Sequence, residues 1–101
     1  MTKVRVYYHP FMDCCMALEG KTIKKISGRS EFVVLSVHAS MRYRTSTGGV
    51  KIDDKKTIGN ILAHFNHTRS WKARDYKKIT DDPSYVLALI KEFLKEHKAT
   101  M

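Results

Sequence analysis

The sequence has no long apolar run and only two cysteines, and both shortages narrow the class of protein. No apolar stretch approaches the ~20 residues that a membrane-spanning helix requires, so we expect no membrane partner. The N-terminal residues lack the apolar core and the cleavage site of a secretion signal. Cys14 and Cys15 are adjacent, and adjacent residues seldom meet the geometry of a disulfide. Free thiols without a secretion signal predict a cytoplasmic protein, or a nuclear or host-cytoplasmic one if the chain comes from a eukaryote or a virus.

Acidic residues are also scarce relative to basic ones. The 101 residues include 19 Lys and Arg but 10 Asp and Glu, which gives a formal net charge of +9. The excess lies in two segments, residues 1–30 with a net charge of +4 and residues 55–78 with a net charge of +6. In the second segment the single carboxylate of Asp75 stands against seven cations. Residues 31–54 and 79–101 are nearly balanced. This distribution favours an anionic partner, either the phosphate backbone of nucleic acid or an acidic protein surface.

Hydrophobic periodicity in the first third of the chain predicts two strands and a segment of mixed character. Residues 3–9 alternate between apolar and polar side chains, which predicts a strand that ends at Pro10. Residues 11–19 fit a short helix or a strand, and we favour the helix. The nearly continuous apolar run over residues 32–39 predicts a central strand, preceded by a turn at residues 27–30.

A Gly-Gly pair at residues 48–49 separates two further predicted strands, residues 41–47 and 50–53. Such a pair is typical of a two-residue hairpin turn, which places Arg44 opposite Asp53. In that register one face is apolar and the other is charged and wet. The apolar face would hold Met41, Tyr43, Thr45, Val50 and Ile52, and the charged face Arg42, Arg44 and Lys51.

Two amphipathic helices are predicted in the last half of the chain. Apolar residues recur with helical spacing over residues 58–65, after a start that Asp54 or Thr57 can cap. A second apolar stripe covers residues 86–94, and Asp82 is a suitable N-cap for it. The chain should therefore form one α+β domain over residues 1–101, a small antiparallel sheet of about four strands with two C-terminal helices packed on one face.

Cations alternate with aromatic residues between the two predicted helices, and this pattern carries the functional prediction. Lys and Arg neutralise phosphates, and Trp or Tyr rings stack on unpaired bases at about 1–3 kcal/mol per base. We predict a non-enzymatic nucleic-acid-binding protein without a cofactor, with RNA slightly favoured over DNA. Alternatively, the two rings hold the segment on the core while its cations face solvent. The predicted contact residues are Arg42, Arg44, Lys51, Lys55, Lys56, Arg69, Trp71, Lys72, Arg74, Tyr76, Lys77 and Lys78.

Two other functions fit the same composition. A small accessory regulator or inhibitor, such as viruses encode, would dock its charged surface on an acidic protein. A small metal-independent ribonuclease would use His38 or His64 as a base beside cations that hold the phosphate. No Cys or His spacing matches a zinc site, so we assign no metal ligand and no catalytic residue.

Overall fold

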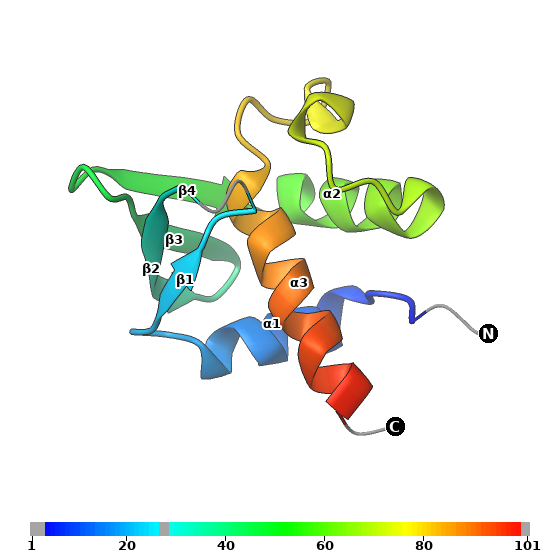
Figure 1. Cartoon of the computed structure of the whole chain (residues 1–101), viewed down its shortest axis with the longest axis horizontal. Coiled ribbons are helices and arrows are strands. Elements are labelled where there is room, and N and C mark those ends of the chain that lie inside the picture. The colour runs from blue at the N-terminus through cyan, green and yellow to red at the C-terminus, as the bar shows by residue number, and fades with distance from the viewer. Residues whose placement is uncertain (1–3, 27–28, 100–101) are drawn as a thin grey trace.

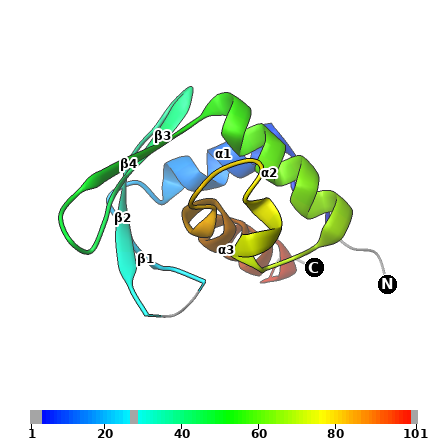
Figure 2. The same cartoon turned by 90° about the horizontal axis from the view of Figure 1, so that it is seen from above.

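The computed structural model describes residues 4–26 and 29–99, with side chains as far as residue 96, and shows an α+β fold (Figure 1). Four antiparallel strands form one sheet in the order β1-β2-β3-β4, and three α-helices lie on one side of it (Figure 2). The fold class is confirmed, and the helix favoured for residues 11–19 joins the two predicted C-terminal helices. The strands are β1 (Thr22–Lys24), β2 (Glu31–Val37), β3 (Ser40–Arg44) and β4 (Val50–Asp54). The helices are α1 (Tyr8–Ala17), α2 (Lys55–Thr68), the short 3-10 helix η1 (Ala73–Tyr76) and α3 (Ser84–Ala99).

The predicted N-terminal strand is wrong, although residues 4–7 do lie against a hydrogen-bonding partner. The Asn66 side chain of α2 accepts a hydrogen bond from Val6 N at 2.8 Å and donates one to Val6 O at 2.9 Å. Arg69 donates a further bond to Val4 O at 2.7 Å. One amide side chain thus satisfies Val6 in both directions, as a neighbouring strand would. The alternation of apolar and polar residues correctly predicts that Val6 is buried, but it does not show that the partner of Val6 is a side chain and not a strand.

Helix α1 begins two residues before Pro10, so this proline lies in the first helical turn and does not end a strand. A proline is tolerated there because the N–H groups of the first turn have no intrahelical partner. The helical interpretation of residues 11–19 is confirmed, with the helix ending at Ala17. Gly20 follows with φ +82° and donates to Val34 O at 2.7 Å, which directs the chain into the sheet.

Strand β2 is an inner strand of the sheet, as its apolar run predicts. It ends at Val37, whose N–H donates to the Glu19 carboxylate at 2.8 Å. His38 therefore lies in the turn between β2 and β3, exposed to solvent, and not within an apolar strand. Of the predicted turn at residues 27–30, residues 27–28 lie outside the described residues.

The β3–β4 hairpin is present, but its predicted register is wrong. The connection has five residues, and Arg44 pairs with Val50, not with Asp53. Of the two glycines only Gly48 takes a positive φ, +92°, whereas the usual two-residue turns of Gly-Gly pairs can require it at both. Thr45 closes the loop instead, because its carbonyl accepts from Gly48 N and its hydroxyl from Gly49 N.

This register changes which side chains share a face of the sheet. Val50 and Ile52 pair with Arg44 and Arg42 and therefore lie on the outer face, which the helices do not cover. Both are more than half exposed, at 55% and 56%. Lys51, predicted on the charged face, belongs to the helix side because it pairs with the buried Tyr43.

Helix α3 forms the centre of the core. All six residues from Tyr85 to Ile90 are buried, because the sheet, α1 and α2 surround its first turns (Figure 2). Tyr85 stacks on Tyr43 with ring centroids 4.9 Å apart and planes 9° apart. Phe32 packs edge-on against both rings. This aromatic contact fixes α3 to β2 and β3.

Replacing Asn66 tests the docking of the N-terminal segment. Asn66→Ala should lower the free energy of unfolding by about 1–3 kcal/mol, because it leaves the polar groups of Val6 without their partner. Urea denaturation measures the loss. The control is Asn60→Ala, at an exposed position of the same helix, which should change stability by less than about 0.5 kcal/mol. Equal stabilities for the two variants would contradict this account of the segment.

Candidate nucleic-acid interface

Helix α2 leads into the basic segment and is fixed at both ends. Asp54, one of the two predicted caps, accepts a hydrogen bond from Thr57 N at 2.8 Å. At the other end Arg69 adopts a left-handed conformation, φ 57°, and its N–H donates to Phe65 O at 2.7 Å. The Arg69 guanidinium lies 4.7 Å from the centre of the Phe65 ring and also binds Val4 O. Arg69, a predicted phosphate contact, is therefore engaged in holding the fold.

Tyr76 is fully buried, so its predicted role in stacking on bases is corrected. Its hydroxyl donates to Ser70 O at 2.7 Å, and its ring lies edge-on to His64 with centroids 4.8 Å apart. The Ser70 hydroxyl in turn donates to the Asp75 carboxylate. For Tyr76 the alternative prediction holds, since this ring secures the segment to the core.

Trp71 takes an intermediate position, with 39% of its surface exposed. One side of the ring packs on Phe65 at a centroid distance of 4.8 Å. The residue also lines a hollow of about 230 Å³ together with Ile26, Ala73, Ser84 and Leu87. Of the two predicted stacking residues, only Trp71 presents a surface to solvent.

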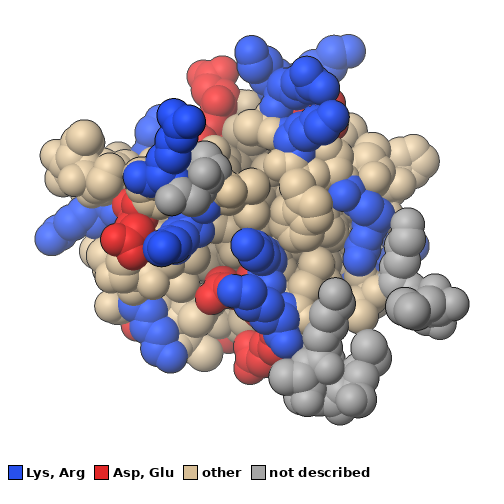
Figure 3. All heavy atoms as spheres, viewed as in Figure 1, with Lys and Arg blue, Asp and Glu red and all other residues tan. Residues whose placement is uncertain are grey.

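Four predicted phosphate contacts remain together on and beside η1. Lys72, Arg74, Lys77 and Lys78 are all exposed and are called the η1 basic cluster below. The ion pairs found in the described part of the chain are Lys25 with Asp82 and Lys95 with Glu92, so none of these four cations is paired there. Figure 3 shows basic side chains gathered over η1 at the top of the molecule.

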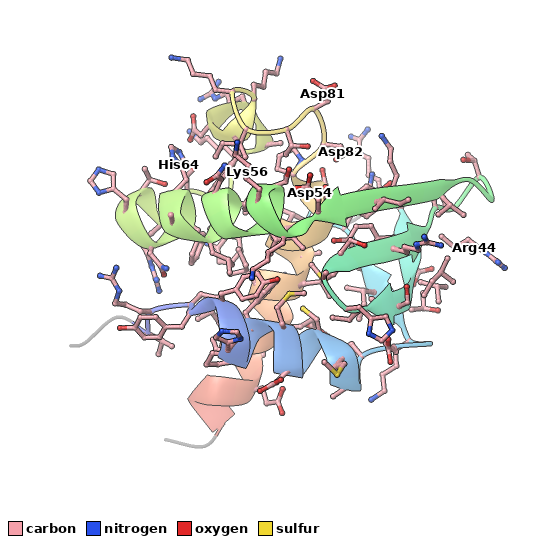
Figure 4. All side chains as sticks on the ribbon, turned by 180° about the vertical axis from the view of Figure 1, so that it is seen from behind. Arg44, Asp54, Lys56, His64, Asp81 and Asp82 are labelled. Atoms are coloured by element: carbon pink, nitrogen blue, oxygen red, sulfur yellow. The ribbon has the colours of Figure 1, made fainter. Side chains whose placement is uncertain are left out.

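The other predicted cations do not all join this cluster. Lys56 extends from the start of α2 toward the side on which η1 lies (Figure 4). Lys55 instead lies over the Tyr8 ring of α1, with its ammonium 5.6 Å from the ring centre. Arg42 and Arg44 are on the outer sheet face, and Arg44 lies far from the end of α2 that holds His64 (Figure 4). The twelve predicted residues thus form no continuous positive surface.

Carboxylates separate the η1 basic cluster from Arg42 and Arg44 on the outer sheet face. Asp54, Asp81 and Asp82 lie between the η1 segment and the sheet (Figure 4). Asp82 is partly neutralised by Lys25, whose ammonium is 3.6 Å from its carboxylate. The η1 basic cluster is therefore bordered by acidic groups on its sheet side.

The outer sheet face combines cations with exposed aliphatic side chains. Arg42 on β3 pairs with Ile52 on β4, and Arg44 pairs with Val50, so each cation lies beside an aliphatic side chain. Leu35, at the irregularity of β2, is also exposed. Between β1 and β3 this surface has a hollow of about 480 Å³, whose walls include Arg44. This face carries no aromatic side chain from the described strands.

Asp53 on β4 is a buried carboxylate, and its surroundings disfavour its charged form. Burial raises its pKa, neighbouring Asp82 and Asp54 raise it further, and the Tyr43 hydroxyl offsets part of the rise. Burial and the Asp53 charge likewise raise the pKa of Tyr43 well above its usual value. In the described structure Tyr43 OH and Asp53 Oδ2 are buried without a well-formed hydrogen bond.

The two cysteines are free thiols whose charged form is disfavoured by their surroundings. Burial raises the pKa of Cys14 to about 12, helped by its hydrogen bond to Glu96, and burial raises that of Cys15 as well. Both thiols therefore stay protonated near neutral pH and are weak nucleophiles. His38 is exposed in the β2–β3 turn, and His64 lies in α2 with its ring edge-on to Tyr76. Over residues 4–26 and 29–96, no three His, Cys, Asp or Glu side chains gather as metal ligands would.

Comparison with known proteins adds no relative. No family model, no curated protein and no solved structure matches the chain. Among the described helices, none is both long and apolar enough to cross a bilayer. The functional argument therefore depends on the surface of this molecule alone.

Two adjacent aspartates should respond to pH in opposite directions. The raised pKa of Asp53 means that its stability contribution is lost as pH rises from the ordinary Asp value through the folded-state value. Asp53→Asn should therefore gain melting temperature relative to the unmodified chain between pH 4 and pH 7. The Thr57 N–H lowers the pKa of Asp54, so the Asp54 contribution is complete above the ordinary Asp value and is lost as pH falls below it. Asp54→Asn should therefore lose melting temperature relative to the unmodified chain as pH rises from about 2 to about 4, below the interval in which Asp53→Asn gains it. Thermal unfolding at several pH values measures both, and parallel curves for the two variants would refute the assignment.

Proposed function

We propose that this chain binds nucleic acid, RNA in preference to DNA, through phosphate contacts made by the η1 basic cluster. The observation that supports the proposal is the presence of four exposed cations between residues 72 and 78, all without an ion-pair partner in the described structure. Unpaired surface cations are available to replace the counterions that surround a nucleic acid. Releasing those counterions drives sequence-independent binding.

The fold supports the proposal because it fixes the cluster before any ligand arrives. The Tyr76 ring and hydroxyl, the bond from Ser70 to Asp75 and the packing of Trp71 on Phe65 all hold the segment to the core. Less conformational entropy is then lost on binding than if the segment were free. Lys56, on the side of α2 that faces η1, extends the same positive surface (Figure 4).

The outer sheet face favours a second candidate function, the binding of an acidic protein segment. Val50 and Ile52 are more than half exposed and lie beside Arg44 and Arg42, so the face offers apolar area together with positive charge. Aliphatic side chains give no flat ring on which bases stack, which favours a protein over a nucleic acid. A second copy of the chain would bring like charges together, which favours a partner with Glu or Asp beside its apolar residues.

The salt dependence of binding tests the proposed function. A 12-nucleotide single strand should bind with a slope of log affinity against log salt of about −3, since each of four phosphate contacts contributes about −0.7. The double variant Lys77→Gln/Lys78→Gln should reduce the slope to about −1.5. Fluorescence anisotropy of a labelled strand measures the slopes. The control Arg42→Gln/Arg44→Gln removes the same charge from the sheet and should leave the slope unchanged. A slope near zero for the unmodified chain would exclude the proposed function.

The second candidate function needs a different probe. An 18-residue amphipathic peptide, with leucines on one helical face bordered by glutamates, should bind more tightly than a scrambled peptide of the same composition. The double variant Val50→Thr/Ile52→Thr should weaken binding by about tenfold, because it removes apolar area from the interface. Calorimetry measures the affinities. Equal binding of both peptides, or no effect of the double variant, would exclude this use of the outer face.

A further inference from the structure

We infer that the hollow beside Trp71 receives one unpaired base, which would make the preferred ligand a single strand and not a duplex. This inference rests on the proposed function, since it assigns a site to the base of a strand whose phosphates contact the η1 basic cluster. The hollow has a volume of about 230 Å³ and lies between the end of β1, the η1 segment and the start of α3.

The size and lining of the hollow fit a single flat ring system. Its volume is below the ~300–1,000 Å³ of pockets for drug-sized ligands, so it has room for one ring system and not for a whole nucleotide chain. The Trp71 indole forms one wall, and the buried Leu87 and half-buried Ile26 add apolar surface. Stacking on an aromatic wall is the usual way in which proteins hold an unpaired base.

The charges around the hollow suit the backbone of the same strand. Lys72 and Arg74 are chain neighbours of the lining residues Trp71 and Ala73, so two cations of the cluster are attached to the backbone that forms one side of the hollow. A base in the hollow would therefore have phosphates within reach of these cations. One ligand explains both the apolar hollow and the cations beside it, because a nucleotide combines an apolar ring with an anionic backbone.

The hollow also predicts weak discrimination between bases. Among its lining residues only Ser84 and the Trp71 indole N–H carry side-chain polar groups. Reading the edge of a base requires several hydrogen-bonding groups in fixed positions, whereas stacking tolerates any base. A duplex would gain the phosphate contacts alone, since its bases are paired and stacked within the helix.

Trp71 is the only tryptophan of the chain and therefore reports on its own site. The experiment compares three probes, a thymidine 12-mer, its duplex with the complementary strand, and an abasic 12-mer with the same number of phosphates. The thymidine strand should quench the Trp71 fluorescence and bind about 5- to 150-fold more tightly than the abasic strand, the range expected for one stacked base. The abasic strand should bind with a similar salt slope and without quenching, and the duplex should not quench.

Variants separate stacking from a general loss of structure. Trp71→Leu should abolish the difference in affinity between the thymidine strand and the abasic strand. Ala73→Leu fills the hollow from an exposed position, keeps Trp71, and should abolish the same difference. The control is Tyr7→Leu, which removes another exposed aromatic ring, and should change neither affinity.

The outcomes distinguish this inference from the proposed function. If all three probes bind with similar affinity in a salt-dependent manner and Trp71 is unaffected, the phosphate proposal stands and the base site is overturned. If neither these probes nor a uridine 12-mer binds in a salt-dependent manner, the proposed function itself fails. A preference for the single strand that survives Ala73→Leu would also overturn the site, because stacking would then occur elsewhere.

Discussion

The stacked rings of Tyr43 and Tyr85, with Phe32 edge-on to both, are the contact on which the arrangement of the molecule depends. They place the first turns of α3 against the sheet, and α1 and α2 surround the same buried turns on their other sides (Figure 2). The segment between α2 and α3 must therefore connect the end of α2 to a fixed starting point of α3. The η1 segment makes this connection, and it is held inward by Tyr76 and by Trp71. Its cations point outward because burying them without partners would cost several kcal/mol each.

The sequence predicts those elements whose signals are local. The apolar run of β2, the helical spacing in α2 and the apolar stripe of α3 are each complete within about ten to fifteen residues, and all three elements are present. The N-terminal segment could not be assigned in this way, because its partner Asn66 lies sixty residues away and offers a side chain in place of a strand. The hairpin register failed for a different reason. A Gly-Gly pair fits both a two-residue and a five-residue connection, and the Thr45 hydrogen bonds that decide between them are not visible in apolar periodicity.

For the candidate interface, the sequence predicts how many cations are exposed but not the face of the molecule on which each one lies. An excess of cations in residues 55–78 can be read from the sequence, since nearly all of them must reach solvent in any fold. Which face each one reaches depends on packing. Lys55 and Lys56 are adjacent, yet one lies over Tyr8 of α1 and the other extends toward the η1 side (Figure 4). Alternation of basic and aromatic residues does not reveal that Tyr76 points inward, because a ring that secures a loop and a ring that stacks on a base leave the same pattern.

The exposure of Trp71 connects the stability of the segment with its use. A tryptophan placed only for packing gains most when it is fully buried, because its stabilising effect grows with the apolar area removed from water. Here one side of the ring packs on Phe65, while 39% of the residue remains exposed beside a hollow. The core therefore fixes the orientation of the ring without covering it. A ligand base that covers the remaining area would remove apolar surface from water at little further loss of side-chain entropy, since the ring is already held. The same contact that keeps the basic cluster rigid thus prepares the one aromatic surface within its reach.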